Sequence, residues 1–356
     1  MKNPFIFGTI VEDQFFTDRT QELRFVEQKL NSENHVILIS PRRFGKSSLV
    51  MKAVKNSHRP FIMLNLQKVV SVQDLASNLL REVFKLYTWE KIKHLISHFR
   101  IVPTITTNPM TDGVDVSFQP STDGFVELED AMKTIEKVST PDKRLIVVLD
   151  EFQEIVSIGK GLDKQMRAIM QLQDNINYIL LGSQESMMTE IFERKKSPFY
   201  HFGSLIRLKK IPFDDFFSYI DEQLRPVLGT DAAEVATRIL TITECHPYYT
   251  QQLASQVWEL ACYEHLQDNV VEVAIDRLSD IHDLDFERLW VGLNKMDRRV
   301  MQALCGTSPG LSLLSSPTST VYSAVNRLMK KGYVIKDRSY EIEDPFFKRW
   351  IVKNRL

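Results

Sequence analysis

A short apolar run followed by a basic turn constrains the fold of this chain more than any other feature. Residues 35–39 are His-Val-Ile-Leu-Ile, and residues 40–48 are Ser-Pro-Arg-Arg-Phe-Gly-Lys-Ser-Ser, after which a helical pattern begins. A β-branched apolar run favours a buried strand, so the segment predicts a strand, a loop and a helix. The spacing fits the phosphate-binding pattern G-x-x-x-x-G-K-[ST], except that Ser40 stands at the first glycine.

The residue types of this loop suit a phosphate ligand. Backbone N–H groups at a helix start carry partial positive charge, and Gly45 has no side chain to keep a phosphate from the backbone. Lys46 is expected to reach the β- and γ-phosphates, and the Ser47 hydroxyl to bind Mg²⁺. If position 40 needs positive φ, Ser40 costs on the order of 1 kcal/mol. The predicted nucleotide contacts are Pro41, Arg42, Arg43, Phe44, Gly45, Lys46, Ser47 and Ser48. The alternative is an ordinary basic strand-to-helix turn.

A second apolar run ends in a pair of carboxylates. Residues 145–149 are followed directly by Asp150 and Glu151. Asp150 is expected to hold the Mg²⁺ shell, mostly through water, and Glu151 to orient and deprotonate the attacking water. An acidic pair at a strand end can instead be merely solvated, but the phosphate loop earlier in the chain favours the catalytic interpretation. Gln153 and Glu154 are expected to face solvent.

A third apolar run, residues 178–182, leads to Ser183. A polar side chain at a strand end beside the γ-phosphate can sense hydrolysis, and a helix N-cap is the alternative role for this serine. Strands alternate with helices over residues 35–209, which is typical of a parallel sheet covered on both faces. A long helix is expected from about residue 71 to residue 98, and a β-hairpin projecting between residues 103 and 124.

Composition excludes several classes of protein. The chain has 356 residues, enough for two or three domains, and its 45 basic residues balance 46 acidic ones. No overall charge therefore points to nucleic acid or membrane. Three scattered cysteines (Cys245, Cys262, Cys305) lack metal-ligand spacing and are typical of reduced thiols. With no evident signal peptide and no apolar run near ~18 residues, a cytoplasmic protein without a membrane span is expected.

The C-terminal third changes character. Residues 212–293 have helical patterns, and residues 246–249 (His-Pro-Tyr-Tyr) indicate a helix start, for which a structural role of His246 is favoured over metal binding. Residues 294–356 predict short helices, with a turn or second short helix at residues 312–316, followed by a two-stranded hairpin, which is the layout of a winged helix. Its helix at residues 319–331 carries Arg327, Lys330 and Lys331 on the face expected to point outward. Contact with DNA and contact with a protein partner both remain open.

Five segments together resemble the archaeal-type ATPases, a prokaryotic branch of the STAND class within the AAA+-like P-loop NTPases. They are residues 16–23, the loop at residues 41–48, and residues 148–153, 246–249 and 343–350. The resemblance implies an α/β P-loop fold with a strand inserted between the two motif-bearing strands. It further implies a core over residues 1–211, an all-helical lid over 212–293 and a winged helix over 294–356.

The resemblance also implies ATP or ADP, with Mg²⁺, bound between core and lid. By match, Arg19 belongs to an N-terminal arginine motif, Val11 ends a segment that holds adenine, and Pro247 is the proline that approaches the nucleotide. The chain departs from the family at Ser40, and at Cys245, where the family often has glycine. After the segment at residues 197–200 it also lacks the arginine that is frequent there, so no arginine finger is assigned.

Three functions follow as expectations. The first is an ATP-hydrolysing switch that couples nucleotide state to the winged helix. The second is a non-hydrolysing ADP- or ATP-binding adaptor or transcription regulator, and the third is an AAA+-type DNA remodeller or loader, which needs assembly and an arginine from a neighbouring copy. The oligomeric state stays open. All three functions need the loop that ends at Lys46 to lie within metal-bridging reach of Asp150 and Glu151. If the loop and the acidic pair follow separate, non-adjacent strands, we take this to argue against all three.

Overall fold

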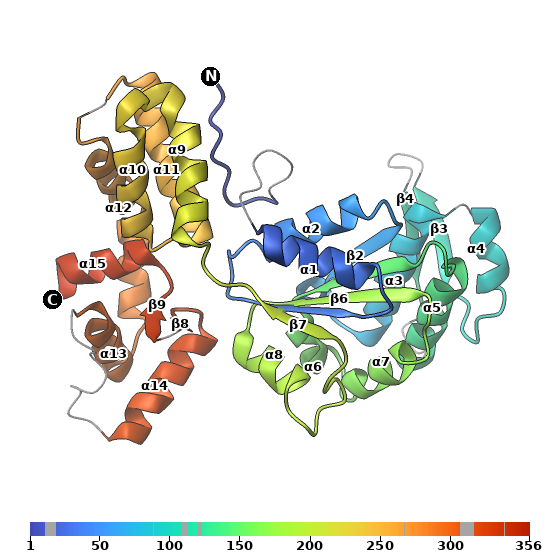
Figure 1. Cartoon of the computed structure of the whole chain (residues 1–356). Helices are drawn as coiled ribbons and strands as arrows, with labels where there is room; N and C mark the ends of the chain where they lie inside the picture. The colour runs from blue at the N-terminus through green and yellow to red at the C-terminus, as the bar shows by residue number, and fades with distance from the viewer. Residues whose placement is uncertain are drawn as a thin grey trace. The chain divides into compact units, whose positions relative to one another are not determined.

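The computed structural model describes residues 1–10, 19–87, 89–108, 113–119, 123–266, 268–306, 317–337 and 339–356 (Figure 1). The chain divides into two compact units. The first, here called the sheet unit, consists of Thr20–Ser40 and Leu49–Leu208. The second, the helical unit, consists of Met1–Arg19, Pro41–Ser48 and Lys209–Leu356.

A five-stranded parallel sheet forms the centre of the sheet unit, in the order β2-β5-β6-β1-β7. Its strands are β1 (Val36–Ile39), β2 (Phe61–Asn65), β5 (Leu145–Asp150), β6 (Ile176–Gly182) and β7 (Ser204–Arg207). Every residue of β1, β5 and β6 is buried, as expected for central parallel strands with both faces covered. The predicted α/β parallel-sheet fold is confirmed, and β6 is the strand expected between β1 and β5.

Helices cover both faces of this sheet (Figure 1). The helices of this unit are α1 (Thr20–Leu30), α2 (Lys46–Asn56), which begins in the loop, α3 (Val72–Leu86), α4 (Trp89–Ile96), which packs on α5, α5 (Gly124–Val138), α6 (Ile155–Ile158), α7 (Leu162–Met170) and α8 (Glu185–Phe192). The single helix predicted from about residue 71 to residue 98 is wrong. Tyr87 has extended backbone (φ −127°, ψ 143°) and ends α3, so the segment forms two helices. The sequence did not reveal this break because the apolar periodicity continues on both sides of it.

The expected hairpin is present as β3 (Thr104–Asn108) paired antiparallel with β4 (Gly113–Ser117). Its turn, residues 109–112, lies outside the described residues. Val116 of β4 is fully buried, β4 lies against α3, and Arg81 of α3 donates to the Asp115 carboxylate at 2.8 Å. The hairpin therefore packs on the unit through β4.

The helical unit is built mainly of helices around one continuous apolar cluster, which extends from α9 to α15 and includes Phe5. Its elements are α9 (Phe213–Leu228), α10 (Ala232–Thr243), α11 (Pro247–Tyr263), α12 (Val270–Val291), α13 (Lys295–Cys305), α14 (Thr318–Lys330), β8 (Val334–Lys336), β9 (Tyr340–Ile342) and α15 (Pro345–Arg355). β8 and β9 form the predicted antiparallel hairpin. The short turn or helix predicted at residues 312–316 lies outside the described residues. The division at residue 293 into a lid and a winged helix stays a prediction.

Two general expectations can be compared with the structure. Across the described ranges, no helix has the length and apolar character needed to cross a membrane. All three cysteines are free thiols, as expected.

Candidate functional site

The carboxyl edge of the sheet gathers two predicted site residues, Asp150 and Ser183, and Ser40, which begins the phosphate-binding pattern. Because the strands are parallel, Ser40 after β1, Asp150 at the end of β5 and Ser183 after β6 all lie at the same edge. All three side chains are buried. β6 separates β1 from β5, so their ends are about 10 Å apart at ordinary strand spacing. Taking non-adjacent strands as evidence against the site was therefore wrong, since the predicted inserted strand itself requires that separation.

Glu151 has a strained backbone and a firmly held side chain. It adopts the left-handed conformation (φ 53°, ψ 47°), which costs a residue with a side chain about 1 kcal/mol or more. Its backbone N–H donates to Asp150 Oδ1 at 2.9 Å. Its Oε2 accepts from the Ser183 hydroxyl at 2.6 Å and from the Ser183 N–H at 3.3 Å. Ser183 thus bonds to Glu151 and does not cap α8, whose N-cap position is Gln184, so the capping alternative is wrong.

Gln153 is a residue of this edge that sequence reasoning missed. It was expected to face solvent, but it is fully buried and donates from Nε2 to Glu151 Oε2 at 2.5 Å. The reason is local, because the chain enters a 3₁₀ turn (Phe152–Glu154) directly after β5, which rotates this side chain inward. Its place in the segment at residues 148–153 that carries the family resemblance was the available signal.

The segment Pro41–Ser48, predicted to bind phosphate, belongs to the helical unit. Gly45 has φ +84°, and a Cβ there would meet no atom within 4 Å, so the glycine serves backbone conformation. Arg43 also has positive φ (65°), but Ser40 does not, so the strain considered for Ser40 does not arise. Lys46 is buried, and its ammonium donates to the Pro41 carbonyl at 2.9 Å.

The other residues assigned by resemblance are partly described. Arg19 is buried and donates from Nη2 to the carbonyls of Phe44 (3.2 Å) and Lys209 (2.6 Å), which ties it to the loop backbone. Val11 lies outside the described residues. Pro247 is the first residue of α11, and His246 Nδ1 accepts from the Tyr248 N–H at 3.2 Å. The predicted helix-start role of His246 is confirmed.

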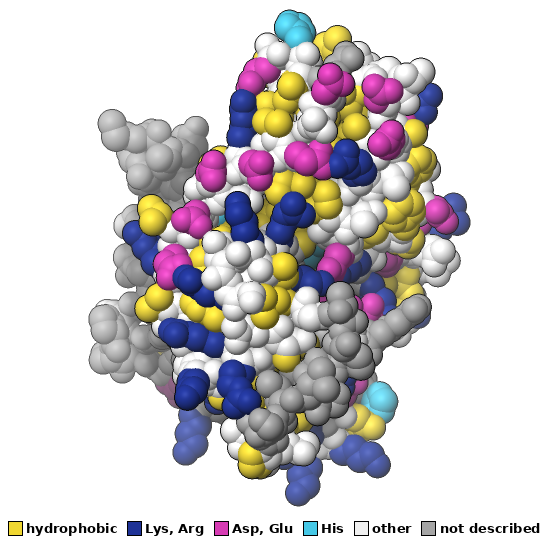
Figure 2. Space-filling model, turned by 90° about the vertical axis from the view of Figure 1, so that its left-hand side faces the viewer, with side chains coloured by type: hydrophobic (Ala, Val, Ile, Leu, Met, Phe, Trp, Pro, Cys, Tyr) yellow, Lys and Arg dark blue, Asp and Glu magenta, His cyan; other side chains and the backbone are white. Residues whose placement is uncertain are grey.

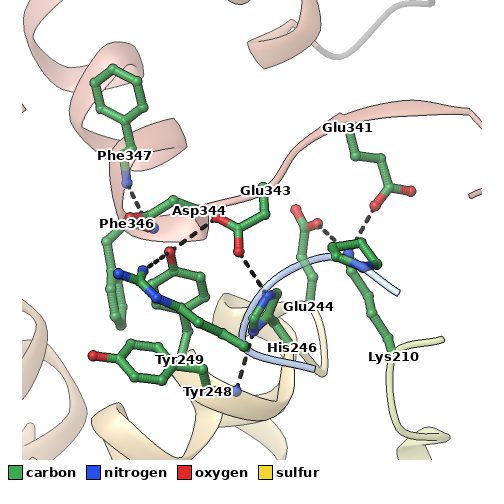
Figure 3. Close-up of polar contacts among 12 residues, drawn as sticks. Lys210, Glu244, His246, Tyr248, Tyr249, Glu341, Glu343, Asp344, Phe346 and Phe347 are labelled. Carbon is green, nitrogen blue, oxygen red and sulfur yellow. Dashed lines mark hydrogen bonds and ion pairs between the residues drawn. The ribbon is translucent and has the colours of Figure 1, made fainter. Parts of the chain in front are cut away.

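A polar cluster in the helical unit, with His246 and Tyr249 buried and Arg43 exposed, was not predicted. We call Arg43, His246, Tyr249 and Glu343 the Glu343 cluster, of which the last three are labelled in Figure 3. Arg43 Nη1 donates to the Tyr249 hydroxyl at 2.9 Å, this hydroxyl donates to Glu343 Oε2 at 3.1 Å, and His246 Nε2 lies 3.2 Å from Glu343 Oε1. Burial would lower the pKa of Arg43, but Tyr249 and Glu343 outweigh it and the pKa is raised. The guanidinium therefore stays charged.

A second charged group lies beside this cluster (Figure 3). Lys210 pairs with Glu341 at 2.8 Å and with Glu244 at 3.1 Å, and Lys348 pairs with Glu244 at 2.6 Å. Burial would raise the pKa of Glu244, but the two lysines outweigh it and the pKa is lowered. Cys245, next in the chain, has φ 56°, which explains why a glycine suits this position.

The basic face of α14 is smaller than predicted. Val321, Ala324, Val325 and Leu328 are buried as expected. Arg327 does not simply project outward, because its guanidinium pairs with the buried Asp297 carboxylate (Nη2 to Oδ1 2.6 Å). Figure 2 shows Lys and Arg side chains gathered over the lower part of the molecular surface in that view. The exposed basic residues of the C-terminal elements are Lys295, Lys330, Lys331, Lys336, Arg349 and Lys353.

Comparisons with known proteins agree with the fold. A family model for an ATPase domain predominantly from Archaea matches residues 16–253. The Walker-type ATPase PABY2304 of Pyrococcus abyssi aligns with a TM-score of 0.69 and 16% identity over 97% of this chain and 99% of that chain. The Aeropyrum pernix ORC2 protein, solved as ADPNP–ADP complexes, has a TM-score of 0.59 and 13% identity over 99% of this chain and 96% of that one. The ORC1 protein of the same organism, in complex with DNA, has a TM-score of 0.51 and 12% identity over 95% and 93%. These identities establish similarity of fold alone, and a search of curated proteins finds no match.

Proposed function

Since this chain belongs to the family of ATPase domains found predominantly in Archaea, we propose that it is an ATP-hydrolysing switch whose nucleotide state controls its C-terminal elements. The observation that carries the proposal is the Glu151 carboxylate, held by the Ser183 hydroxyl at the carboxyl edge of the sheet. A general base must be oriented before it can take a proton from water, and this bond supplies an orientation. The loop that follows β1 supplies the phosphate-binding chemistry.

Each site residue has a role in this proposal. Loop N–H groups and the Lys46 ammonium bind the phosphates, and Gly45 provides the left-handed backbone that the loop needs. The Ser47 hydroxyl and the Asp150 carboxylate are oxygen donors of the kind that Mg²⁺ prefers, and they would hold this ion. Magnesium would neutralise the charge that develops on the phosphates. Glu151 orients and deprotonates water, and Ser183 holds Glu151.

Nucleotide recognition outside the loop rests on the family resemblance. Arg19 and Pro247 are proposed to approach the nucleotide, and Val11 to contact adenine. The bonds from Arg19 to the Phe44 and Lys209 carbonyls support a role for this arginine in shaping the loop.

The C-terminal elements are proposed to form a winged helix that binds DNA or a protein partner. Exposed Lys330 and Lys331 at the end of α14 are the proposed contacts. Arg327 is proposed to stabilise the fold through Asp297 and not to contact the partner directly.

A non-hydrolysing, nucleotide-binding adaptor is the second candidate. It is favoured by the three donors on Glu151 Oε2, because a carboxylate oxygen so engaged is a poorer proton acceptor. ADP retained through purification, with no phosphate release from added ATP, would support this candidate over the first.

Phosphate release by two variants tests the leading proposal. Lys46→Ala is expected to lose ATP binding, and Glu151→Gln is expected to keep it while turnover falls about 100-fold or more. Lys137→Ala, at an exposed lysine of α5, is the matched control for removal of a charge and is expected to retain wild-type turnover. Unchanged turnover in both Lys46→Ala and Glu151→Gln would exclude hydrolysis at this site.

A further inference from the structure

The Glu343 cluster joins three segments that lie far apart in the sequence. Arg43 comes from the loop, His246 and Tyr249 from the start of α11, and Glu343 from the turn between β9 and α15. Figure 3 shows the His246 and Tyr249 side chains turned toward the Glu343 carboxylate. Since both carboxylate oxygens are engaged, Glu343 ties the start of α11 to the start of α15.

Proton positions in this cluster follow from its bonds. His246 Nδ1 accepts from the Tyr248 N–H, so Nε2 carries the ring proton and donates to Glu343. Burial raises the pKa of Tyr249, so its hydroxyl keeps its single proton, which is shared between the Glu343 carboxylate and that of Asp344, the N-cap residue of α15. The phenol oxygen is then free to accept from Arg43.

The loop is attached to α11 at two points. The Arg43 guanidinium lies 4.7 Å from the Tyr248 ring centroid and 5.9 Å from that of Tyr249, in addition to its hydrogen bond. The Phe44 ring meets the His246 ring edge-on at 4.8 Å. A change in the loop therefore reaches both residues that donate to Glu343.

The acceptor that Arg43 uses here is a neutral oxygen. Phosphate oxygens form charge-assisted and often bidentate bonds with arginine, which are stronger than a bond to a neutral hydroxyl. We infer that nucleotide phosphate and Tyr249 compete for Arg43, so that Arg43 reports nucleotide binding to α15 through Tyr249 and Glu343. This inference rests on the proposed function, because it takes a phosphate to be the loop's ligand.

The competition has a defined consequence. When phosphate takes Arg43, Tyr249 loses the donor that polarises its hydroxyl, and its bond to Glu343 weakens. The start of α15, where Asp344 caps the helix next to Glu343, is then held less firmly. Because coupling is reciprocal, removing the Tyr249 hydroxyl is expected to strengthen nucleotide binding.

Tyr249→Phe is the test, because it removes the hydroxyl and keeps the ring. In the full chain, calorimetry is expected to show ADP binding roughly three- to tenfold tighter, the range that one neutral hydrogen bond produces. Hydrogen exchange over residues 345–355 is expected to rise when ADP binds the wild type. In Tyr249→Phe it is expected to be raised before ADP is added and to change little afterwards. Tyr248→Phe, the same change one residue earlier, is expected to behave as the wild type.

The outcomes separate this inference from the proposed function. If neither ADP nor ATP binds the wild type, both fail. If ADP binds but exchange in α15 does not change, or Tyr249→Phe binds ADP as the wild type does, only the coupling fails. Glu343→Gln is a second variant should Tyr249→Phe not fold. It removes the charge and keeps the shape, and it is expected to raise exchange in α15 and tighten ADP binding in the same direction. Unchanged ADP affinity in Glu343→Gln overturns the coupling.

Discussion

Glu151 and Glu343 both follow a strand and both accept hydrogen bonds from distant residues, but the two are positioned in different ways. Glu151 follows β5 in the sheet unit, and its partner Ser183 follows the neighbouring strand β6. Glu343 follows β9 in the helical unit, and its partners lie at the start of α11. The position of the Glu151–Ser183 pair is set by strand register, and that of Glu343 and its partners by how the turn after β9 lies against the start of α11.

The difference bears on what each glutamate can do. Strand register is held by backbone hydrogen bonds between fully buried strands, so the Glu151–Ser183 pair cannot shift without disrupting the sheet. The Glu343 cluster depends on side-chain bonds between the loop, the start of α11 and the turn before α15, and such bonds adjust by small rotations at lower cost. The first arrangement suits catalysis, and the second suits the reporting of a bound ligand.

Acid is expected to affect the sheet unit most, through His35. Its Nδ1 accepts from the Tyr178 N–H at 3.2 Å, and burial, assisted by Arg167, lowers its pKa to about 4. The unfolded chain binds a proton at this histidine near pH 6.5, whereas the folded chain does so only near pH 4. The free energy of unfolding is therefore unaffected by His35 above pH 6.5 and falls as the pH drops toward 4. At 1.36 kcal/mol per pH unit, the free energy of unfolding is expected to fall by about 3 kcal/mol over this interval. Urea unfolding at pH 7 and pH 4.5 measures it.

The His35 prediction can be tested with two variants and by comparison with Asp344 of the helical unit. His35→Asn keeps an acceptor near Tyr178 and is expected to remove most of the pH dependence, whereas His201→Asn, at an exposed histidine, is expected to keep it. Burial raises the pKa of Asp344 in the helical unit, so acidification through that pKa favours its folded form, which is the opposite sign. The prediction is wrong if His35→Asn loses stability with acid as steeply as the wild type.

Ser183→Ala is expected to separate catalysis from binding. Without the hydroxyl, Glu151 Oε2 loses its 2.6 Å bond and its orientation, so kcat for ATP hydrolysis is expected to fall about 10- to 100-fold. KM is expected to change little, because Ser183 positions the base and is not a proposed ligand of the nucleotide. Ser183→Thr, which keeps a hydroxyl, is expected to recover part of the rate. A wild-type kcat in Ser183→Ala would show that strand register alone holds Glu151.

Cys245→Gly has the smallest expected effect and tests the cost of left-handed backbone at a residue with no proposed catalytic role. Cys245 and Glu151 have nearly equal positive φ (56° and 53°), but only Glu151 has a proposed catalytic role. Glycine at position 245 is expected to raise the free energy of unfolding by about 0.5 kcal/mol and leave turnover unchanged. Cys262→Gly, inside α11, is expected to lower it by about 1 kcal/mol, because the change lowers helix propensity and removes a thiol that packs against the apolar cluster. A lower urea midpoint for Cys245→Gly would mean that packing of the thiol outweighs backbone strain.

Much of the sheet edge could be predicted from the sequence. Apolar runs that end in Asp150 and Ser183 identify buried parallel strands, and parallel strands place their carboxyl ends at one edge. The sequence could not predict that Gln153 turns inward, because a 3₁₀ turn after a strand leaves no periodic signal. The break at Tyr87 was missed for the converse reason, since the helical periodicity continues on both sides of it.

By itself the sequence determined the order of the elements, the parallel sheet, the loop at Pro41–Ser48 and the carboxylates that end β5, because each depends on local pattern and spacing. Only the tertiary structure decided that Arg43, Tyr249 and Glu343 meet. The pairing of Arg327 with Asp297 was also decided there. These contacts depend on how segments far apart in the sequence pack together, and a local pattern says which residues of a segment are buried but not which residue each of them meets.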